Sequence, residues 1–217
     1  MENLSLIPGE VGASAVQNIG AYGVEAKDFI TSLHALDLND GKVVEITNAE
    51  CEYAYRQSRF KHEWKNRFII LDVTYRLSCV FVPHLDYGNI RSVLAERGIE
   101  NPTAQMLRDV IIAIRRDKLP DYEVEGNAGS FFMNPIVPME KYRILAEQDP
   151  NMPHYPIDAD HEKIPAGWMI DQCGWKGRTV GRAGVHAKQA LVLVNRGGAT
   201  GEEVVNLCHL IQEDVKS

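Results

Sequence analysis

Ser130 is the side chain that its neighbours best prepare for a chemical role. It follows the run Glu125-Gly126-Asn127-Ala128-Gly129, in which two glycines and an asparagine allow backbone conformations with positive φ. It precedes Phe131 and Phe132, an aromatic pair that we expect to be buried. The pattern predicts a hydroxyl at the edge of a dry pocket, where a proton donor is useful. A glycine turn that leads into a buried strand is compatible with the same residues.

Arg56 is the second candidate, because it lies among aromatic residues in the segment 53–60. A guanidinium stays charged, and its planar fork matches the oxygens of a carboxylate or an enolate. An arginine beside tyrosines is also common at protein surfaces, where its stem packs along the rings. The residue types alone leave both roles open.

Three motifs, in this order along the chain, resemble those of the UDP-N-acetylenolpyruvoylglucosamine reductase family, also called UDP-N-acetylmuramate dehydrogenase. They are Ile7-Pro8-Gly9 through Gln17-Asn18-Ile19-Gly20-Ala21-Tyr22-Gly23, then Tyr55-Arg56-Gln57-Ser58, then Gly126 to Pro135. The resemblance covers essentially the whole chain. It implies a flavoenzyme of bacterial peptidoglycan synthesis that contains FAD and uses NADPH. Its reaction would convert the enolpyruvyl ether of UDP-N-acetylglucosamine to UDP-N-acetylmuramate.

The resemblance also implies roles for individual residues. Ser130 would donate a proton to the substrate, and Arg56 would lie near the flavin and the substrate carboxylate. Ala15 stands where the family usually has proline, and Met133 where many relatives carry lysine. The implied FAD contacts are Ile7, Pro8, Gly9, Gly12, Ser14, Ile19, Gly20 and Arg56, and the implied substrate contacts are Tyr87, Lys118, Asn134, Tyr155 and Gln189.

Residue types alone support simpler roles for the implied substrate contacts. Tyr87 fits the edge of a core, and Lys118 fits a solvated lysine after a helix. Asn134 fits an Asn-Pro turn, and Tyr155 and Gln189 fit ordinary loops.

The implied fold is α+β. It consists of the C-terminal half of a vanillyl-alcohol-oxidase-like FAD-binding domain over residues 1–117, followed by an α/β domain that binds the UDP-sugar over residues 118–217. We place the break here because Pro120 cannot continue the preceding helix. The family's earlier glycine-serine loop for FAD and its C-terminal strand with a second catalytic glutamate have no counterpart in the sequence. We therefore expect a part of a longer protein, with Met1 as an added initiator, that binds FAD poorly and turns over little substrate or none.

Hydrophobic periodicity and turn residues predict the elements that carry these residues. The residues of Gly9 to Gly23 are expected to form a loop, and Ile69, Leu71, Val73, Tyr75 and Leu77 to share one strand face. Thr200 and Glu203 form a capping box at the start of the last helix. The expected strands are 29–38, 42–47, 67–77, 180–185 and 190–194, with a hairpin turn at 39–41, and the expected helices are 103–116, 138–148, 165–173 and the segment after Thr200.

Composition limits the classes of partner. The net charge of −7 argues against sequence-independent binding of nucleic acid. The four cysteines are far apart and predict reduced, mostly buried thiols, while His62-Glu63 and His161-Glu162 lack the second histidine of a zinc motif and are expected at the surface. No metal site is predicted. No apolar run is long enough for a membrane span, so we expect a cytoplasmic protein, of undetermined oligomeric state.

Two other functions are compatible with the sequence. In the first, the chain is a non-catalytic module that binds a UDP-sugar, and the serine motif is a loop on the phosphate side. In the second, it is a flavin-dependent sugar oxidase with the same FAD-binding architecture. Such oxidases often hold the flavin covalently through histidine or cysteine, and the segment from Gly9 to Gly23 contains neither.

Overall fold

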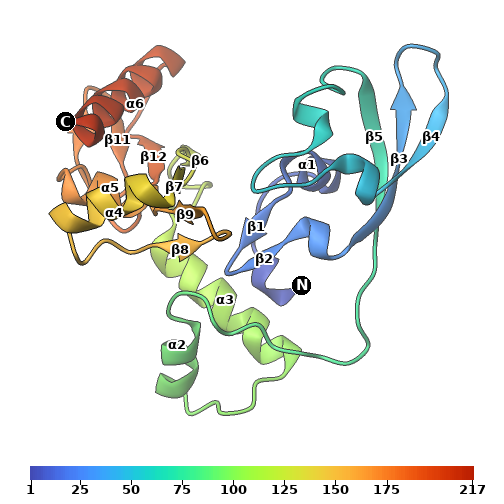
Figure 1. Ribbon diagram of the computed structural model, residues 1–217, viewed down its shortest axis with the longest axis horizontal. Coiled ribbons are helices and arrows are strands. Elements are labelled where there is room, and N and C mark those ends of the chain that lie inside the picture. Colours follow the sequence, from blue (N-terminus) through green and yellow to red (C-terminus); the bar gives the residue numbers. More distant parts are fainter. The chain divides into compact units, whose positions relative to one another are not determined.

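The computed structural model describes residues 1–217, which form two compact units (Figure 1). The first unit runs from Met1 to Arg115 and the second from Arg116 to Ser217. The helix α3, Ala104–Lys118, crosses this division. All strand pairs in both units are antiparallel, so the chain is α+β, and the strands of the second unit do not form the parallel sheet of an α/β domain.

The first unit combines a long hairpin with short helices (Figure 1). Its elements are η1 Glu2–Leu4, α1 Val11–Gln17, β1 Gly20–Ala21, β2 Val24–Glu25, η2 Ala26–Asp28, β3 Ile30–Asp37, β4 Val43–Thr47, η3 Ala49–Cys51, η4 Arg59–Lys61, β5 Phe68–Tyr75, α2 Ile90–Glu96 and most of α3.

The main sheet of this unit has the strand order β4–β3–β5. The predicted hairpin is confirmed: β3 pairs with β4 in antiparallel register, and Gly41 takes a positive φ of 70° in the turn. Asp37 ends β3, is 5% exposed and accepts two hydrogen bonds from the Arg67 guanidinium. This bond to Arg67 is the main reason that the pKa of Asp37 is lowered from its ordinary value.

The face of β5 that turns inward differs from the prediction. Ile70 pairs with Ala35 and Asp72 pairs with His34, so Leu71 is an extra residue between two adjacent positions of β3. Such a β-bulge reverses the alternation of side chains along the strand. Ile69 and Leu71 are therefore exposed while Val73 and Tyr75 pack on the core, and Leu77, beyond the end of β5, is also exposed.

The predicted loop from Gly9 to Gly23 is wrong for residues 11–17, which form α1. Asn18 ends this helix in the left-handed conformation, with φ 45° and ψ 62°. Ala15 is fully buried in the core under the sheet, and a side chain at Gly12 would touch Ile70 of β5. The helix packs on the sheet through these small residues.

A second cluster in this unit joins α2 and α3. Thr103 caps the start of α3, because Met106 N donates to Thr103 Oγ1 at 3.2 Å. Met106 itself is exposed. The buried members of this cluster are Ile90, Leu94, Leu107, Val110, Ile111 and Ile114.

The second unit contains two small sheets and three helices in addition to the end of α3 (Figure 1). Its remaining elements are β6 Asn127–Ser130, β7 Ile136–Pro138, α4 Met139–Gln148, β8 Tyr155–Pro156, β9 His161–Lys163, α5 Ala166–Gln172, β10 Thr179–Val180, β11 Ala183–Val185, β12 Val192–Asn195 and α6 Gly201–Lys216.

One sheet has the order β10–β11–β12–β6 and the other has the order β7–β9–β8. The predicted single strand over 180–185 is wrong, because residues 181–182 form a turn between β10 and β11. Gly181 takes a positive φ of 60° there, a conformation that glycine adopts without steric cost. The strand predicted over 190–194 begins at Val192.

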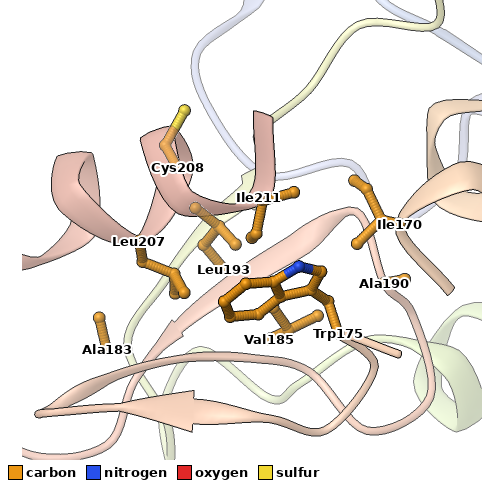
Figure 2. Close-up of a cluster of buried hydrophobic side chains, with 9 residues drawn as sticks. All are labelled: Ile170, Trp175, Ala183, Val185, Ala190, Leu193, Leu207, Cys208 and Ile211. Carbon is orange, nitrogen blue, oxygen red and sulfur yellow. The ribbon is translucent and has the colours of Figure 1, made fainter. Parts of the chain in front are cut away.

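The core of the second unit lies between the sheet β10–β11–β12–β6 and α6. Figure 2 shows Trp175 among residues of α5, of the sheet and of α6. Trp175 Nε1 donates to Asp214 Oδ2 at 2.8 Å, so the indole is both packed and hydrogen-bonded. The predicted capping box of α6 is confirmed, since Thr200 Oγ1 accepts from Glu203 N and Thr200 N donates to Glu203 Oε2.

The four cysteines of the chain differ in their exposure to solvent. All four cysteines are free thiols, but Cys79 is exposed, contrary to the prediction of mostly buried thiols. Cys173 is half-buried, and Cys51 and Cys208 are buried.

None of the helices combines the length and the apolar character that a membrane crossing needs.

Candidate functional site

Arg56 lies on a tight turn in the first unit, and its guanidinium is held by main-chain oxygens. Ala54 and Gln57 form an isolated antiparallel bridge around it, and Arg56 itself has a positive φ of 56°. Arg56 Nη1 donates to Asn18 O at 3.3 Å, and Nη2 donates to Gly20 O. The turn therefore points the guanidinium at the chain that follows α1.

Gly20 has no room for a side chain. A Cβ at this position would lie 2.8 Å from Arg56 Nη1 and 3.1 Å from Val24 O. The glycine of the motif is thus required by the close approach of a guanidinium and of the neighbouring strand.

Tyr87 packs on the same hairpin, β1–β2. A Cβ at Gly23 would lie 3.5 Å from Tyr87 Cβ, and the Tyr87 ring meets Tyr22 edge to face, with 6.3 Å between their centroids. The buried Asn3 amide donates to the carbonyls of Tyr22 and His84. These two bonds connect the β1–β2 hairpin with the segment that precedes Tyr87. Arg56 and Tyr87 thus both pack against the β1–β2 hairpin, at Gly20 and at Gly23.

The other predicted FAD contacts of this unit divide into two groups. Pro8 and Gly9 are exposed, Ile7 is half-buried, and a Cβ at Gly9 would meet no atom within 4 Å. Ser14 is 7% exposed, and its Oγ bonds to Tyr75 Oη and donates to Val11 O inside the unit. Gly12 lies against β5 and Ile19 packs on the core, so these residues face inward like Ser14.

Ser130 is the last residue of β6, where it pairs with Val192. Gly129 before it has a positive φ of 63°, and Asn127 Oδ1 accepts from Gly129 N at 3.0 Å. Within the second unit Ser130 is exposed and Phe131 is 38% exposed. The expected burial of the aromatic pair is therefore wrong for Phe131, while Phe132 is partly buried against the core.

Asn134 and Gln189 both approach the beginning of α5. Asn134 Oδ1 accepts from Ala166 N at 2.9 Å, and Gln189 Oε1 accepts from Leu191 N at 3.4 Å. A Cβ at Gly167 would lie 3.3 Å from Gln189 Oε1. Phe131 N donates to Leu191 O, so this group is also joined to the serine strand.

Tyr155 belongs to β8 and is 37% exposed, with Lys163 Nζ 5.8 Å from the centre of its ring. Glu162, the neighbour of Lys163, is buried, and its Oε2 lies within hydrogen-bond distance of His154 Nδ1, at 3.0 Å. The prediction of a surface position for His161-Glu162 is therefore wrong for Glu162. Its carboxylate instead anchors the residue that precedes Tyr155.

Lys118 is half-buried at the end of α3. Its neighbour Asp117 forms an ion pair with Lys188 at 2.6 Å, and this hydrogen bond is the main cause of a lowered Asp117 pKa. Because Lys188 precedes Gln189, the ion pair connects the end of α3 with the Gln189 loop.

Sequence reasoning missed an anchored group behind the serine strand. Arg196 Nη1 donates to Glu125 Oε1 at 2.6 Å, and His186 Nδ1 lies 3.9 Å from Glu125 Oε2. His186 Nδ1 is buried without a hydrogen-bond partner, and burial lowers the pKa of this imidazole. These partners are far apart along the chain, so no local pattern reveals them.

Known proteins similar to this chain carry one common name. Residues 120–217 match the family model of the UDP-N-acetylenolpyruvoylglucosamine reductase C-terminal domain. The UDP-N-acetylenolpyruvoylglucosamine reductase of Bacteroides fragilis is 54% identical over 217 residues, which are 100% of this chain and 64% of that protein. The protein of the same name from Paraburkholderia phymatum is 51% identical. The match includes 99% of this chain and 63% of that protein.

A solved structure extends the similarity to the fold. The crystal structure of the reductase from Thermus caldophilus matches 98% of this chain and 59% of its own, with a TM-score of 0.63 and 21% identity. The chain spans somewhat less than two thirds of the length of the curated relatives that it matches. By the family model and the sequence similarity along its whole length, the chain belongs to the UDP-N-acetylenolpyruvoylglucosamine reductase family.

Proposed function

We propose that the protein to which this chain belongs reduces the enolpyruvyl group of UDP-N-acetylenolpyruvoylglucosamine to give UDP-N-acetylmuramate, with FAD as cofactor and NADPH as reductant. The observation that carries the proposal is the 54% identity along all 217 residues with a protein of that name. The packing of Arg56 and Tyr87 against one hairpin supports it, because the reaction needs a cation close to an anionic substrate.

We assign the residues up to Asp117 to part of a vanillyl-alcohol-oxidase-like FAD-binding domain, and the residues from Lys118 onward to UDP-sugar binding. The match of residues 120–217 to the C-terminal domain model supports the second assignment. The division into compact units between Arg115 and Arg116 is compatible with both assignments.

The residues of the first unit fit a flavin in part. Gly9 has open space at its Cβ position, and Leu6 and Val11 beside it expose apolar side chains at 45% and 59%. Exposed apolar groups around a bare backbone suit a flat aromatic ring. Ser14 does not fit a direct side-chain contact, because its hydroxyl is bonded inside the unit. When bound, FAD would supply the hydride for the reaction.

Arg56 would stabilise the negative charge that develops on the substrate carboxylate when the double bond accepts hydride. Its two hydrogen bonds to Asn18 O and Gly20 O leave further N–H donors of the guanidinium for substrate oxygens. These bonds also fix the guanidinium before substrate arrives, which lowers the reorganisation needed during the reaction.

Ser130 would donate the proton that completes the reduction of the double bond. Its place at the end of β6, after the positive φ of Gly129, leaves the hydroxyl exposed for such a role. Tyr87, Lys118, Asn134, Tyr155 and Gln189 would hold the UDP-sugar. The positions of Asn134 and Gln189, both near the start of α5, support a shared task for these two residues.

The proton-donor role predicts a selective defect in Ser130→Ala. NADPH should reduce the flavin at the wild-type rate, whereas reoxidation by substrate should fall by about 10²- to 10⁴-fold, the usual value of a positioned proton donor. Stopped-flow absorbance of the flavin separates the two half-reactions in the holoenzyme.

Ser78→Ala is the matched control, because Ser78 is an exposed serine whose Oγ bonds to Val80 O. This variant should retain both rates. An equal loss of both half-reactions in Ser130→Ala would count against the assigned role.

A non-catalytic UDP-sugar-binding module is the second candidate. The observation in its favour is that Lys118, Asn134, Tyr155 and Gln189 all belong to a unit with its own core. Isothermal titration with UDP-N-acetylglucosamine, together with the absorbance spectrum of the purified chain, distinguishes the candidates. Sugar-nucleotide binding without bound flavin and without turnover, also when the missing segments are restored, would favour the module.

A further inference from the structure

Asn18 is fully buried, and both ends of its side-chain amide make hydrogen bonds. Nδ2 donates to Ala54 O at 2.9 Å and to Glu25 Oε2 at 3.0 Å, while Oδ1 accepts from Lys27 N at 3.0 Å. A buried amide with partners on separate segments is costly to remove, because each partner would lose its hydrogen bond in a dry environment. Asn18 is thus a fixed point of the first unit.

The main chain of Asn18 also contacts Arg56 directly. Asn18 O accepts from Arg56 Nη1 at 3.3 Å, and Gly20, two positions later, accepts from Nη2. Ala54, the acceptor of the Asn18 side chain, lies just before Arg56 on the same turn. One residue therefore holds both the backbone that carries Arg56 and the guanidinium itself.

The remaining ties of this turn have a different geometry. Ser58 Oγ donates to Val16 O at 2.7 Å, and Lys61 Nζ donates to Arg56 O at 2.8 Å. Both bonds attach the turn, but neither touches the guanidinium. The guanidinium itself is contacted by Gly20 O, by the Tyr55 ring at 5.2 Å and by Asn18 O. Of these three residues, Asn18 is the one whose side chain also binds the turn, through Ala54 O.

We propose that Asn18 is a positioning residue for Arg56, so that its amide determines where the guanidinium meets an anionic group. The proposal rests on the function given above, in which Arg56 stabilises charge on the substrate. It adds a residue that contacts neither substrate nor cofactor but acts through Arg56.

Two substitutions remove the amide without forcing a new backbone conformation. Asn18→Gly keeps the left-handed conformation, which glycine adopts readily, and removes all three side-chain bonds. Asn18→Asp keeps the size and the acceptor but loses the two donated bonds.

Asn48→Ala is the matched control. Asn48 Nδ2 donates to Lys27 O and Ile30 O in the same unit, and Asn48 is in the right-handed helical conformation that alanine favours. This variant loses two donated bonds, and neither acceptor residue hydrogen-bonds to Arg56. Lys27 N can still donate to Asn18 Oδ1 in it, so the Asn18 amide keeps its partners.

The readout is hydrogen exchange of the Arg56 guanidinium protons by NMR in the full chain labelled with ¹⁵N-arginine, with Arg56→Lys to assign the signals. Exchange should be about tenfold faster or more in both Asn18 variants, because the bonds to Asn18 O and Gly20 O open more often. In Asn48→Ala the Arg56 guanidinium protons should exchange at the wild-type rate, even where the melting temperature of this variant falls as much as that of the Asn18 variants.

Three outcomes would overturn the proposal. They are unchanged Arg56 exchange in folded Asn18 variants, an equal acceleration in Asn48→Ala, and loss of folding in both Asn18 variants while Asn48→Ala folds. The last would mean that Asn18 serves the fold of the unit as a whole.

The function of Arg56 is tested separately, so that the two failures can be told apart. In the holoenzyme, reoxidation of the flavin by substrate at the wild-type rate in Arg56→Lys would show that the reaction does not need the Arg56 guanidinium. The exchange experiment on the chain would still report whether Asn18 orients this side chain.

Discussion

Single glycines and carboxylates in the first unit have roles that depend on one neighbour. Gly20 leaves space for the Arg56 guanidinium, and Asp37 accepts the forked hydrogen bonds of Arg67. Both contacts link residues far apart in sequence. Substitution at either position should therefore report on the packing around that residue.

Gly20→Ala should lower the free energy of unfolding by about 1 to 3 kcal/mol, the usual cost of overpacking. The added Cβ would lie 2.8 Å from Arg56 Nη1 and 3.1 Å from Val24 O, so both the guanidinium and β2 would have to move. Urea unfolding followed by circular dichroism measures the change.

Gly201→Ala is the control for Gly20→Ala. Gly201 is the first residue of α6, and a Cβ there would meet no atom within 4 Å. This variant should be unchanged or more stable by up to about 1 kcal/mol, because alanine favours helix. Wild-type stability of Gly20→Ala would contradict the packing derived for Arg56.

Asp37→Asn should weaken the dependence of stability on acid pH. Because Arg67 lowers the pKa of Asp37 below its ordinary value of 3.8, the stabilisation from this carboxylate is complete above that value. It is lost as pH falls through the lowered pKa. Urea midpoints between neutral pH and about pH 2 should therefore fall less steeply in Asp37→Asn than in wild type.

Asp40→Asn is a suitable control for this titration, because Asp40 is an exposed carboxylate of the same hairpin that pairs with Lys42. Its slope should match that of wild type. Identical slopes for Asp37→Asn and wild type would mean that the Arg67 bond does not affect stability.

At the scale of elements, the regular ends of helices follow from local residues. The cap of α6 depends on Thr200 and Glu203, which bond to each other's main-chain N–H groups. Such a reciprocal cap needs no long-range information, which explains why the sequence predicts it.

Thr200→Ala should destabilise the protein by about 1 kcal/mol, because Glu203 N loses its acceptor at the first turn of α6. Thermal unfolding by calorimetry measures this loss. Thr200→Ser keeps the oxygen and should stay within a few tenths of a kcal/mol of wild type. Equal stability of the alanine and serine variants would show that the cap contributes nothing measurable.

Features that depend on tertiary pairing were not predictable from local patterns. The bulge at Leu71 exists because β5 must pair with two adjacent residues of β3, and it exposes Ile69 and Leu71 despite their alternation. The turn at Gly181 divides a run that reads as one strand. In both cases the partner strand decides the conformation, and its register is not written in the local sequence.

At the scale of the whole molecule, the sequence predicts the mixed α+β class, the hairpin and the family. The candidate residues were predicted through the motifs, but their contacts were not. The bonds from Arg56 to Asn18 and Gly20 and from Arg196 to Glu125 join positions that only the folded chain brings together. The roles of these residues in catalysis stay predictions.

The Trp175–Asp214 bond has a practical consequence for spectroscopy. The indole is 2% exposed, and its N–H is held by the last turns of α6, so its emission should be blue-shifted while the helix is docked. Release of α6 would admit water to the ring and shift the spectrum to longer wavelength. With Trp64 and Trp168 replaced by phenylalanine, this fluorophore would report the integrity of the second unit without any added label.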